Sequence, residues 1–283
     1  MGDNLYVERA MQRYSISTYI VQEAPRAEAL ALIAGAGFTL VELGCDPGHL
    51  GDWYKDPAAM RRELAALGLT PASLHIPTVA WDVANPDAAA RRVALDAARA
   101  TFDLAAEVGA EAVICHPNAS THPYSEETFD AETARSRESV VEMAGYAAEA
   151  GVRMALENLP ARHTPRPGTT IGEVLAMIDG LGDHVGVCLD AGHSNANGYS
   201  AADEVREAGA RLFALHIQDN DGQGDDQHIL PGRGTTDWEA FLDALDDIDF
   251  AGLRTFEVGP HVASPEDVAA LCALRDAWLA RGR

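Results

Sequence analysis

The chain has 283 residues, 47% of them hydrophobic, which is ample for a large buried core and well matched to one (β/α)8 barrel. Asp and Glu together number 44 against 21 Lys and Arg, giving a formal net charge of -23. A surface this acidic disfavours nucleic acids and anionic membranes, because both bind through positive charge on the protein.

Short β-branched or apolar runs alternate along the chain with Ala-, Leu-, Arg- and Glu-rich stretches of helical periodicity. The expected strands are Tyr14–Tyr19, Thr39–Leu43, Ala72–His75, Ala112–His116, Arg153–Glu157, Val185–Asp190, Leu212–Ile217 and Gly252–Glu257. The expected helices are Pro25–Ala36, Pro57–Leu67, Pro86–Val108, Glu126–Ala150, Thr170–Leu181, Ala201–Ala208, Asp237–Leu245 and Pro265–Ala280. Alternation of this kind indicates a parallel sheet.

Eight strand–helix units without a break in composition predict a single domain over residues 1–283. We expect an α/β fold of the (β/α)8 TIM barrel type rather than an open, doubly wound sheet. No Gly-rich dinucleotide fingerprint follows the first expected strand, and the sequence contains no Walker motif. These absences exclude the usual phosphate loops of open α/β sheets.

Cysteine usage and hydropathy bear on the cellular compartment. The cysteines Cys45, Cys115, Cys188 and Cys272 are far apart and form no Cys-x-x-Cys pair, which is typical of reduced core thiols. Residues Met1–Arg13 lack the apolar stretch of a signal peptide, and no apolar run approaches the roughly 20 residues that span a bilayer. We therefore expect a cytoplasmic protein that does not engage a membrane.

Residues that bind metals or move protons stand at or beside the ends of seven consecutive expected strands. They are Glu42, His75, His116, Glu157, Asp190, His216 and Glu257. In a (β/α)8 barrel the chemistry takes place at this end of the strands. A single residue of this kind is more often a structural charge or a core histidine, so the pattern gains its weight from the whole set.

The acidic members of this set predict a metal site. Glu157, Asp190 and Glu257 each follow an apolar run, and carboxylates beside a core are costly unless they are paired or bound to metal. Brought together at one barrel mouth they would repel one another, and a divalent cation removes that repulsion. His216 completes a mixed nitrogen and oxygen ligand set that suits Mn²⁺, Mg²⁺, Co²⁺ or Zn²⁺.

The loops after the sixth and seventh expected strands add further polar residues. His193 stands just beyond Asp190, and Asp226 and His228 follow the seventh strand. Arg233, in the turn Pro231–Gly234, can hold a substrate hydroxyl, carboxylate or phosphate, or is simply a surface turn residue. Aromatic residues near the mouth can stack on a sugar face, although each is more often ordinary packing; they are Trp53, Tyr54, Trp81, Tyr124 and Tyr199.

The strand ends and loops together resemble the xylose-isomerase-like barrels, which include sugar isomerases and epimerases and the endonuclease-IV-type AP endonucleases. The resemblance runs from the first strand to the eighth. Its motifs are Leu-His-Ile-Pro (74–77), Cys-His-Pro-Asn (115–118), Leu-Glu-Asn-Leu-Pro (156–160), Leu-Asp-Ala-Gly-His (189–193), Leu-His-Ile-Gln-Asp-Asn (215–220), Asp-Gln-His-Ile-Leu-Pro-Gly-Arg-Gly (226–234) and Phe-Glu-Val (256–258). Each motif alone is weak, but their order and spacing are specific.

The resemblance implies roles for individual residues. In the single-metal epimerase branch, Glu157, Asp190, His216 and Glu257 would be the ligands, and Glu157 and Glu257 would also exchange the substrate proton. The expected substrate contacts are His193, Arg233, His75 and His116.

The trinuclear zinc endonuclease branch uses a larger ligand set, which also matches here. Its residues are His75, His116, Glu157, Asp190, His193, His216, Asp226, His228 and Glu257. The ligands alone therefore do not separate the branches, and one to three ions are open. A DNA-cleaving enzyme also needs basic mouth loops, whereas Lys55 is the single lysine of this chain.

We expect an enzyme of carbohydrate metabolism, a metal-dependent isomerase or epimerase that moves a proton beside a carbonyl through an enediolate. Ketose 3-epimerase, aldose–ketose isomerase, hydroxypyruvate-type isomerase and inosose-type dehydratase chemistry all stay open. The alternatives are an AP endonuclease and a metal-binding barrel without catalysis. The expected partner is a small sugar-like molecule, with no nucleic acid and no membrane, and a homo-oligomer is left open.

Overall fold

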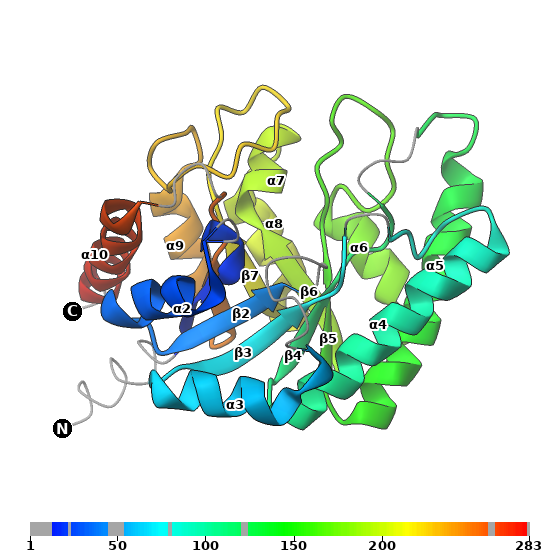
Figure 1. The fold of residues 1–283 in the computed structure, drawn as a ribbon. Coiled ribbons are helices and arrows are strands. Elements are labelled where there is room, and N and C mark those ends of the chain that lie inside the picture. Colours follow the sequence, from blue (N-terminus) through cyan, green and yellow to red (C-terminus); the bar gives the residue numbers. More distant parts are fainter. Residues whose placement is uncertain are drawn as a thin grey trace.

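The computed structural model describes residues 13–21, 24–44, 54–78, 81–119, 124–259 and 264–281. The parallel strands close into a barrel in chain order, with the last strand paired to the first. The strands are β1 Tyr14–Ser17, β2 Leu40–Gly44, β3 Thr70–His75, β4 Ala112–Cys115, β5 Arg153–Glu157, β6 Val185–Asp190, β7 Leu212–Ile217 and β8 Leu253–Phe256. The expected (β/α)8 barrel is confirmed (Figure 1).

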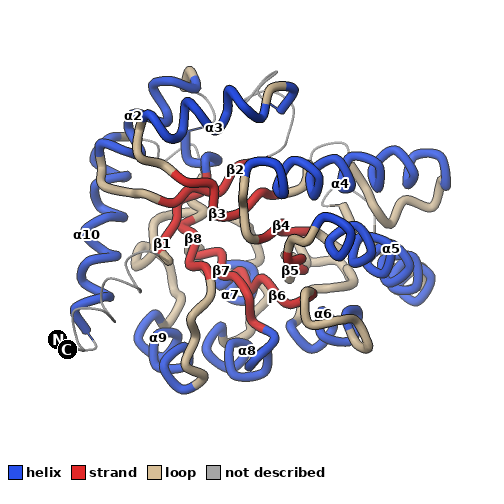
Figure 2. The backbone as a smooth tube through the Cα atoms, turned by 90° about the horizontal axis from the view of Figure 1, so that it is seen from below, coloured by secondary structure: helices blue, strands red, loops and turns tan. Residues whose placement is uncertain are grey.

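Helices form an outer layer around the strands, as the view from below shows (Figure 2). They are α2 Arg26–Gly35, α3 Pro57–Ala66, α4 Ala88–Val108, α5 Phe129–Ala150, α6 Ile171–Ile178, α8 Ala201–Ala208, α9 Trp238–Asp247 and α10 Pro265–Arg281. The short helix α7, Ala191–Ala196, lies instead at the end of the barrel, beyond β6. Local sequence sets the ends of the helices. The Asp87 side chain accepts from the backbone N–H groups of Ala89 and Ala90 at the start of α4, and Gly109 ends that helix with a φ of 82°.

Several elements begin or end one to three residues from their expected bounds, and two larger differences bear on the mouth of the barrel. The run expected as one strand to Tyr19 is split, because β1 ends at Ser17 and a 3-10 helix, η1, covers Thr18–Val21. The hydroxyls of Ser17 and Thr18 accept from the backbone N–H groups of Tyr19 and Gly44, in competition with the strand ladder. The short helix α7 was not expected; it begins directly after Asp190, whose carboxylate accepts from His193 N at 2.7 Å.

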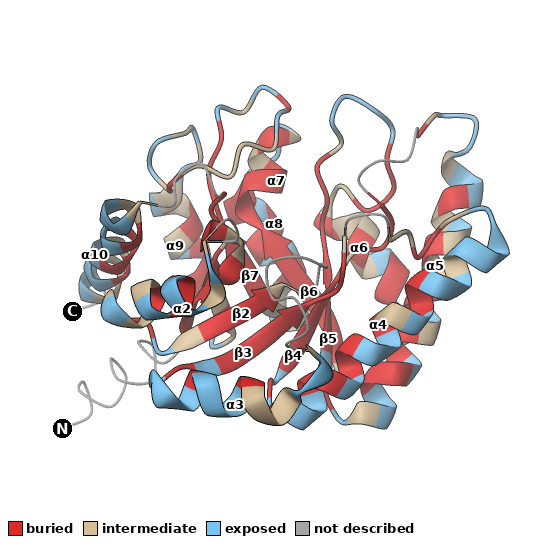
Figure 3. Cartoon of the chain, in the orientation of Figure 1, coloured by how far each residue is buried: buried red, intermediate tan, exposed pale blue. Residues whose placement is uncertain are grey.

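Two apolar layers make up the core. The larger one lies between the strands and the inner faces of the helices, where buried residues concentrate (Figure 3). The smaller one lies inside the barrel and is rich in small side chains: Ala72, Ala112, Ile114, Ala155, Cys188, Ala214 and Leu253. Above it, toward the carboxyl ends of the strands, the barrel interior turns polar with buried Glu42, Glu157, Asp190 and His216.

The described cysteines lie in the protein interior. Cys115, Cys188 and Cys272 are buried free thiols, while Cys45 lies outside the described residues. Among the helices that the structure describes, none is both long and apolar enough to cross a bilayer.

Candidate metal centre

The expected ligands come together at the carboxyl ends of the strands. Glu157 and Asp190 end β5 and β6, His216 lies one residue before the end of β7, and Glu257 directly follows β8. One ligand atom from each of these residues lies within 4.8 Å of all the others. Glu157, Asp190 and His216 are at most 1% exposed, and the Glu257 side chain is 13% exposed. The expected four-residue set is therefore one compact cluster.

His216 is the contact between the two glutamates of this cluster. Its Nδ1 lies 3.0 Å from Glu157 Oε1 and 3.1 Å from Glu257 Oε2. Burial raises the pKa of both carboxyls, but the neighbouring histidines together outweigh it, His216 with His116 at Glu157 and His216 with His228 at Glu257, and each pKa ends below its usual range. In the protein without metal, a charged imidazole thus partly neutralises the two carboxylates.

Asp190 is the least satisfied member of the cluster. Its Oδ1 caps α7 and also accepts from the Gln218 amide, but its buried Oδ2 has no hydrogen-bond partner among the described residues. Burial raises the pKa of Asp190 to about 6, although the charge of His193 opposes the shift. A buried carboxylate oxygen without a donor is costly. Such an oxygen makes Asp190 a candidate metal ligand, because a cation would compensate its charge.

A second group surrounds the other oxygen of Glu157. Oε2 lies 3.2 Å from His75 Nε2 and 3.1 Å from His116 Nε2. Burial lowers the pKa of both histidines, but the hydrogen bond and charge of Glu157 outweigh it for His75, whose pKa rises to about 9. For His116 burial wins and the pKa falls to about 4. The positive charge of the neighbouring His75 lowers the pKa of His116 further.

A third group lies in the loops beyond β6 and β7. Asp226 is 3.4 Å from His193 Nε2 and 3.0 Å from His228 Nε2. Burial raises the pKa of Asp226, but the two histidines hold it well below its usual range. His228 reaches this position with a left-handed φ of 48°, an uncommon conformation for a residue with a side chain and one that often marks functional sites.

Backbone carbonyls fix the direction of three of these rings. The Nδ1 atoms of His75, His193 and His228 lie 2.7–2.8 Å from the carbonyl oxygens of Ile76, Asn158 and Glu257. An Nδ1–H that donates to a carbonyl leaves Nε2 directed at the carboxylates. Metal-binding histidines are commonly oriented in this way.

Comparison with known proteins agrees with this architecture. Residues 30–276 match the family of xylose isomerase-like TIM barrels. The chain belongs to this family. The resemblance expected from the motifs is thereby confirmed.

Relatives of this xylose isomerase-like barrel include named sugar epimerases. It is 28% identical over 258 residues to L-ribulose 3-epimerase of Methylomonas sp. (strain DH-1), covering 89% of this chain and 85% of that protein. It is 31% identical over 127 residues to D-psicose 3-epimerase of Enterocloster bolteae, covering 44% of this chain and 40% of that protein. A solved D-tagatose 3-epimerase-like protein has the same fold, with a TM-score of 0.82 at 19% identity over 95% of this chain and 97% of that one.

Some expected site residues lie apart from the clusters. Arg233 is 60% exposed at its side chain, with its guanidinium 3.6 Å from Asp267, and no contact joins it to the clusters among the described residues. The Tyr124 hydroxyl donates to Asn118 and Ala119, and Tyr199 is 48% exposed. Trp53 lies outside the described residues.

Two further polar residues join the site although the sequence did not single them out. The Gln218 amide donates to Asp190 and Asp226, both at 3.1 Å, and so links the first group to the third. It packs on Gly192, where a Cβ would lie 2.1 Å from the amide carbon. Gln218 follows His216 by two residues and therefore faces the same side of β7, a signal that the sequence offered. Arg162, with a left-handed φ of 49°, places its guanidinium 3.5 Å from Asp226.

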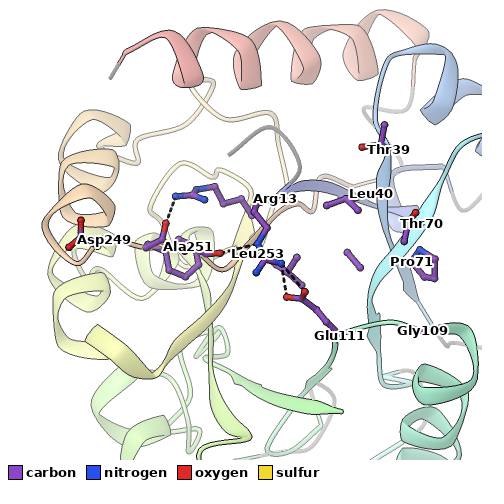
Figure 4. Close-up of a pocket in the computed structure, with 13 residues that line it drawn as sticks. Arg13, Thr39, Leu40, Thr70, Pro71, Gly109, Glu111, Asp249, Ala251 and Leu253 are labelled. Atoms are coloured by element: carbon purple, nitrogen blue, oxygen red, sulfur yellow. Dashed lines mark hydrogen bonds and ion pairs between the residues drawn. The ribbon is translucent and has the colours of Figure 1, made fainter. Parts of the chain in front are cut away.

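A cavity of about 760 Å³ lies at the opposite end of the barrel. Figure 4 shows Arg13 and Glu111 pointing toward each other across it. Arg13 donates to both oxygens of Glu111 at 2.8–2.9 Å and to the carbonyl of Ala251. Because this is the amino end of the strands, which in such barrels is associated with stability rather than catalysis, we do not place the active site here.

Proposed function

We propose that this protein is a metal-dependent epimerase or isomerase of a small keto-sugar or related polyol. The observation that carries the proposal is the buried cluster of Glu157, Asp190, His216 and Glu257 at the carboxyl end of the barrel. The relatives named as L-ribulose and D-psicose 3-epimerases support the same class of reaction.

The residues present fit a divalent cation. Three carboxylates and one imidazole offer oxygen and nitrogen ligands, which suit Mn²⁺, Co²⁺, Mg²⁺ or Zn²⁺. The bare Oδ2 of Asp190 is the strongest single argument for a ligand that brings positive charge. Glu157, Asp190, His216 and Glu257 would hold one ion, and the groups His75–Glu157–His216 and His193–Asp226–His228 would suit up to two more. When bound, the metal would polarise the substrate carbonyl and offset developing negative charge.

Glu157 and Glu257 are the proposed proton-transfer pair. They come from β5 and β8, which are not neighbours in the barrel, so their carboxylates approach the mouth from different sides. One removes the proton beside the carbonyl to give an enediolate, and the other returns a proton to the opposite face. Glu157 Oε2 is held by His75 and His116, whereas the Glu257 side chain is more exposed at 13%. His193, His75 and His116 are proposed to contact the substrate. The same role for Arg233 stays a prediction from the sequence, since its exposed guanidinium lies beside Asp267 and apart from the clusters.

The test is turnover of a ketose panel in D₂O by metal-loaded protein. Deuterium at the carbon beside the carbonyl of the product is the expected result. Turnover with full retention of the original hydrogen would instead indicate a hydride shift, in which neither glutamate acts as a base. Absence of turnover across the panel with each metal restored would count against the proposed class.

A second candidate function is an AP endonuclease with a trinuclear zinc site. The observation in its favour is that the complete nine-residue set lies in three adjoining groups. The net charge of -23 and the single lysine oppose it, because a phosphate backbone is bound mainly through cationic side chains. We expect no useful affinity for duplex DNA at physiological salt. Efficient, chelator-sensitive incision of an abasic-site duplex would reverse the order of the two candidates.

A further inference from the structure

His216 differs from the histidines beside it in the direction of its ring. His75, His193 and His228 turn Nδ1 toward backbone carbonyls, whereas His216 turns Nδ1 toward Glu157 and Glu257. Its Nε2 lies 3.1 and 3.3 Å from the two carboxylate oxygens of Glu42. Some other group must therefore fix this ring, and Glu42 is in place to do so.

Glu42 reaches His216 across the interior of the barrel. It lies on β2, whereas His216 lies on β7, and both side chains are fully buried. The pairing of β2 with β3 shifts register between Val41 and Glu42. A shift of this kind alters the direction of the side chains that follow it. Glu42 is then opposite Ser73, whose hydroxyl donates to Glu42 Oε2 at 2.7 Å.

The surroundings of Glu42 leave His216 as its charge partner. Ion pairs of Glu42 with Lys or Arg are absent from the described residues, and Oε1 has no hydrogen bond of good geometry there although His216 Nε2 is 3.1 Å away. Burying a carboxylate is costly unless a donor or a positive charge compensates it. The Nε2–H of His216 provides that compensation, because it faces the Glu42 carboxylate and either oxygen can accept from it.

We propose that Glu42 is a positioning residue that holds His216 with its proton on Nε2 and its Nδ1 lone pair toward the metal centre. A carboxylate behind a ligating imidazole fixes its tautomer and makes it a stronger ligand. The inference rests on the proposed metal centre but not on the reaction. It explains why a fully buried acidic residue stands in β2 without contributing to the ligand cluster itself.

The test compares the affinity for Zn²⁺, measured by chelator competition, in wild type, Glu42→Gln, Glu42→Ala and Ser73→Ala. Loss of a partner of this kind weakens metal binding about 10- to 100-fold, and we expect this for both Glu42 variants and less for Ser73→Ala. Glu132→Gln is the control, because it changes another buried carboxylate, on α5, and should leave affinity unchanged. If Glu42→Ala does not fold, the Zn²⁺ affinity of the isosteric Glu42→Gln decides whether Glu42 supports metal binding.

A second readout is the imidazole N–H proton of His216 in the zinc-loaded protein, assigned by its loss in His216→Gln. We expect a downfield, exchange-protected signal in wild type that shifts upfield in Glu42→Gln and disappears in Glu42→Ala. Wild-type affinity with an unshifted signal in Glu42→Gln would overturn the role of Glu42 alone. A wild-type protein that binds no metal ion would overturn the proposed metal centre, and this inference with it.

Discussion

The two ends of this barrel are built from the same strands but differ in how deeply their charged side chains are buried. At the carboxyl end Glu42, Glu157, Asp190 and His216 are at most 1% exposed. At the amino end the charged side chains of Arg13 and Glu111 form an ion pair while 33% and 40% exposed. Buried charges are costly and need a compensating ligand, whereas exposed pairs are screened by water. This difference supports the proposed site at the carboxyl end, where the buried Oδ2 of Asp190 has no hydrogen-bond partner among the described residues.

The largest expected effect is on turnover. Glu157→Gln and Glu257→Gln keep the size of the side chain but remove its charge and its ability to take a proton. We expect each variant to lower kcat by about two to four orders of magnitude, the scale of an essential proton-transfer group. Glu111→Gln, the same change at the opposite end, is the control and should keep wild-type kcat. Wild-type turnover in either cluster variant would remove that residue from the mechanism.

Metal removal should have the next largest effect. A ligand that binds only the native state stabilises it by about 2.7 kcal/mol at a hundred times its Kd, which for a chain of this size raises Tm by about 5–10 °C. Chelation should lower the Tm of wild type by this amount, and re-addition of metal should restore it. Asp190→Ala also removes the cap of α7 and should lower Tm for that reason alone. The informative quantity is therefore the change in its Tm on chelation, which should be nil. Equal responses in both proteins would mean that Asp190 is not a ligand.

The stability of the metal-free protein should depend on pH through histidines at the carboxyl end. Burial lowers the pKa of His75 and His193, but neighbouring carboxylates outweigh it and raise each pKa from 6.5 to about 9. A raised folded-state pKa means that the stabilisation is fully present below pH 6.5 and is lost as pH rises through 9. We expect the urea midpoint of metal-free protein to fall over this range. That of loaded protein should fall less, because a bound cation offsets the charge of the carboxylates that raise these two pKa values. A midpoint that rises in the metal-free protein would contradict the assigned shifts.

Much of the fold and the cluster could be predicted because both depend on local signals. Alternating periodicity located the strands, and residue type at their ends located Glu157, Asp190, His216 and Glu257. The direction of each imidazole could not be predicted, since it depends on acceptors distant in the chain, such as Glu42 for His216. The pairing of Arg233 with Asp267 is likewise a tertiary contact between a loop and α10.

The smallest expected effect is at the amino end. Nη1 of Arg13 donates to both carboxylate oxygens of Glu111 at 2.8–2.9 Å, but the two side chains are 33% and 40% exposed, so water and salt screen their attraction. A double-mutant cycle with Arg13→Gln and Glu111→Gln should give a coupling of about 0.2–1 kcal/mol that decreases in high salt, with kcat unchanged throughout. Arg13→Gln should lower the free energy of unfolding more than Glu111→Gln, because Nε of Arg13 also donates to the carbonyl of Ala251 next to β8. A coupling above about 2 kcal/mol would show that the pair is stronger than a screened surface contact. A kcat that follows the cycle would contradict the separation of the two ends.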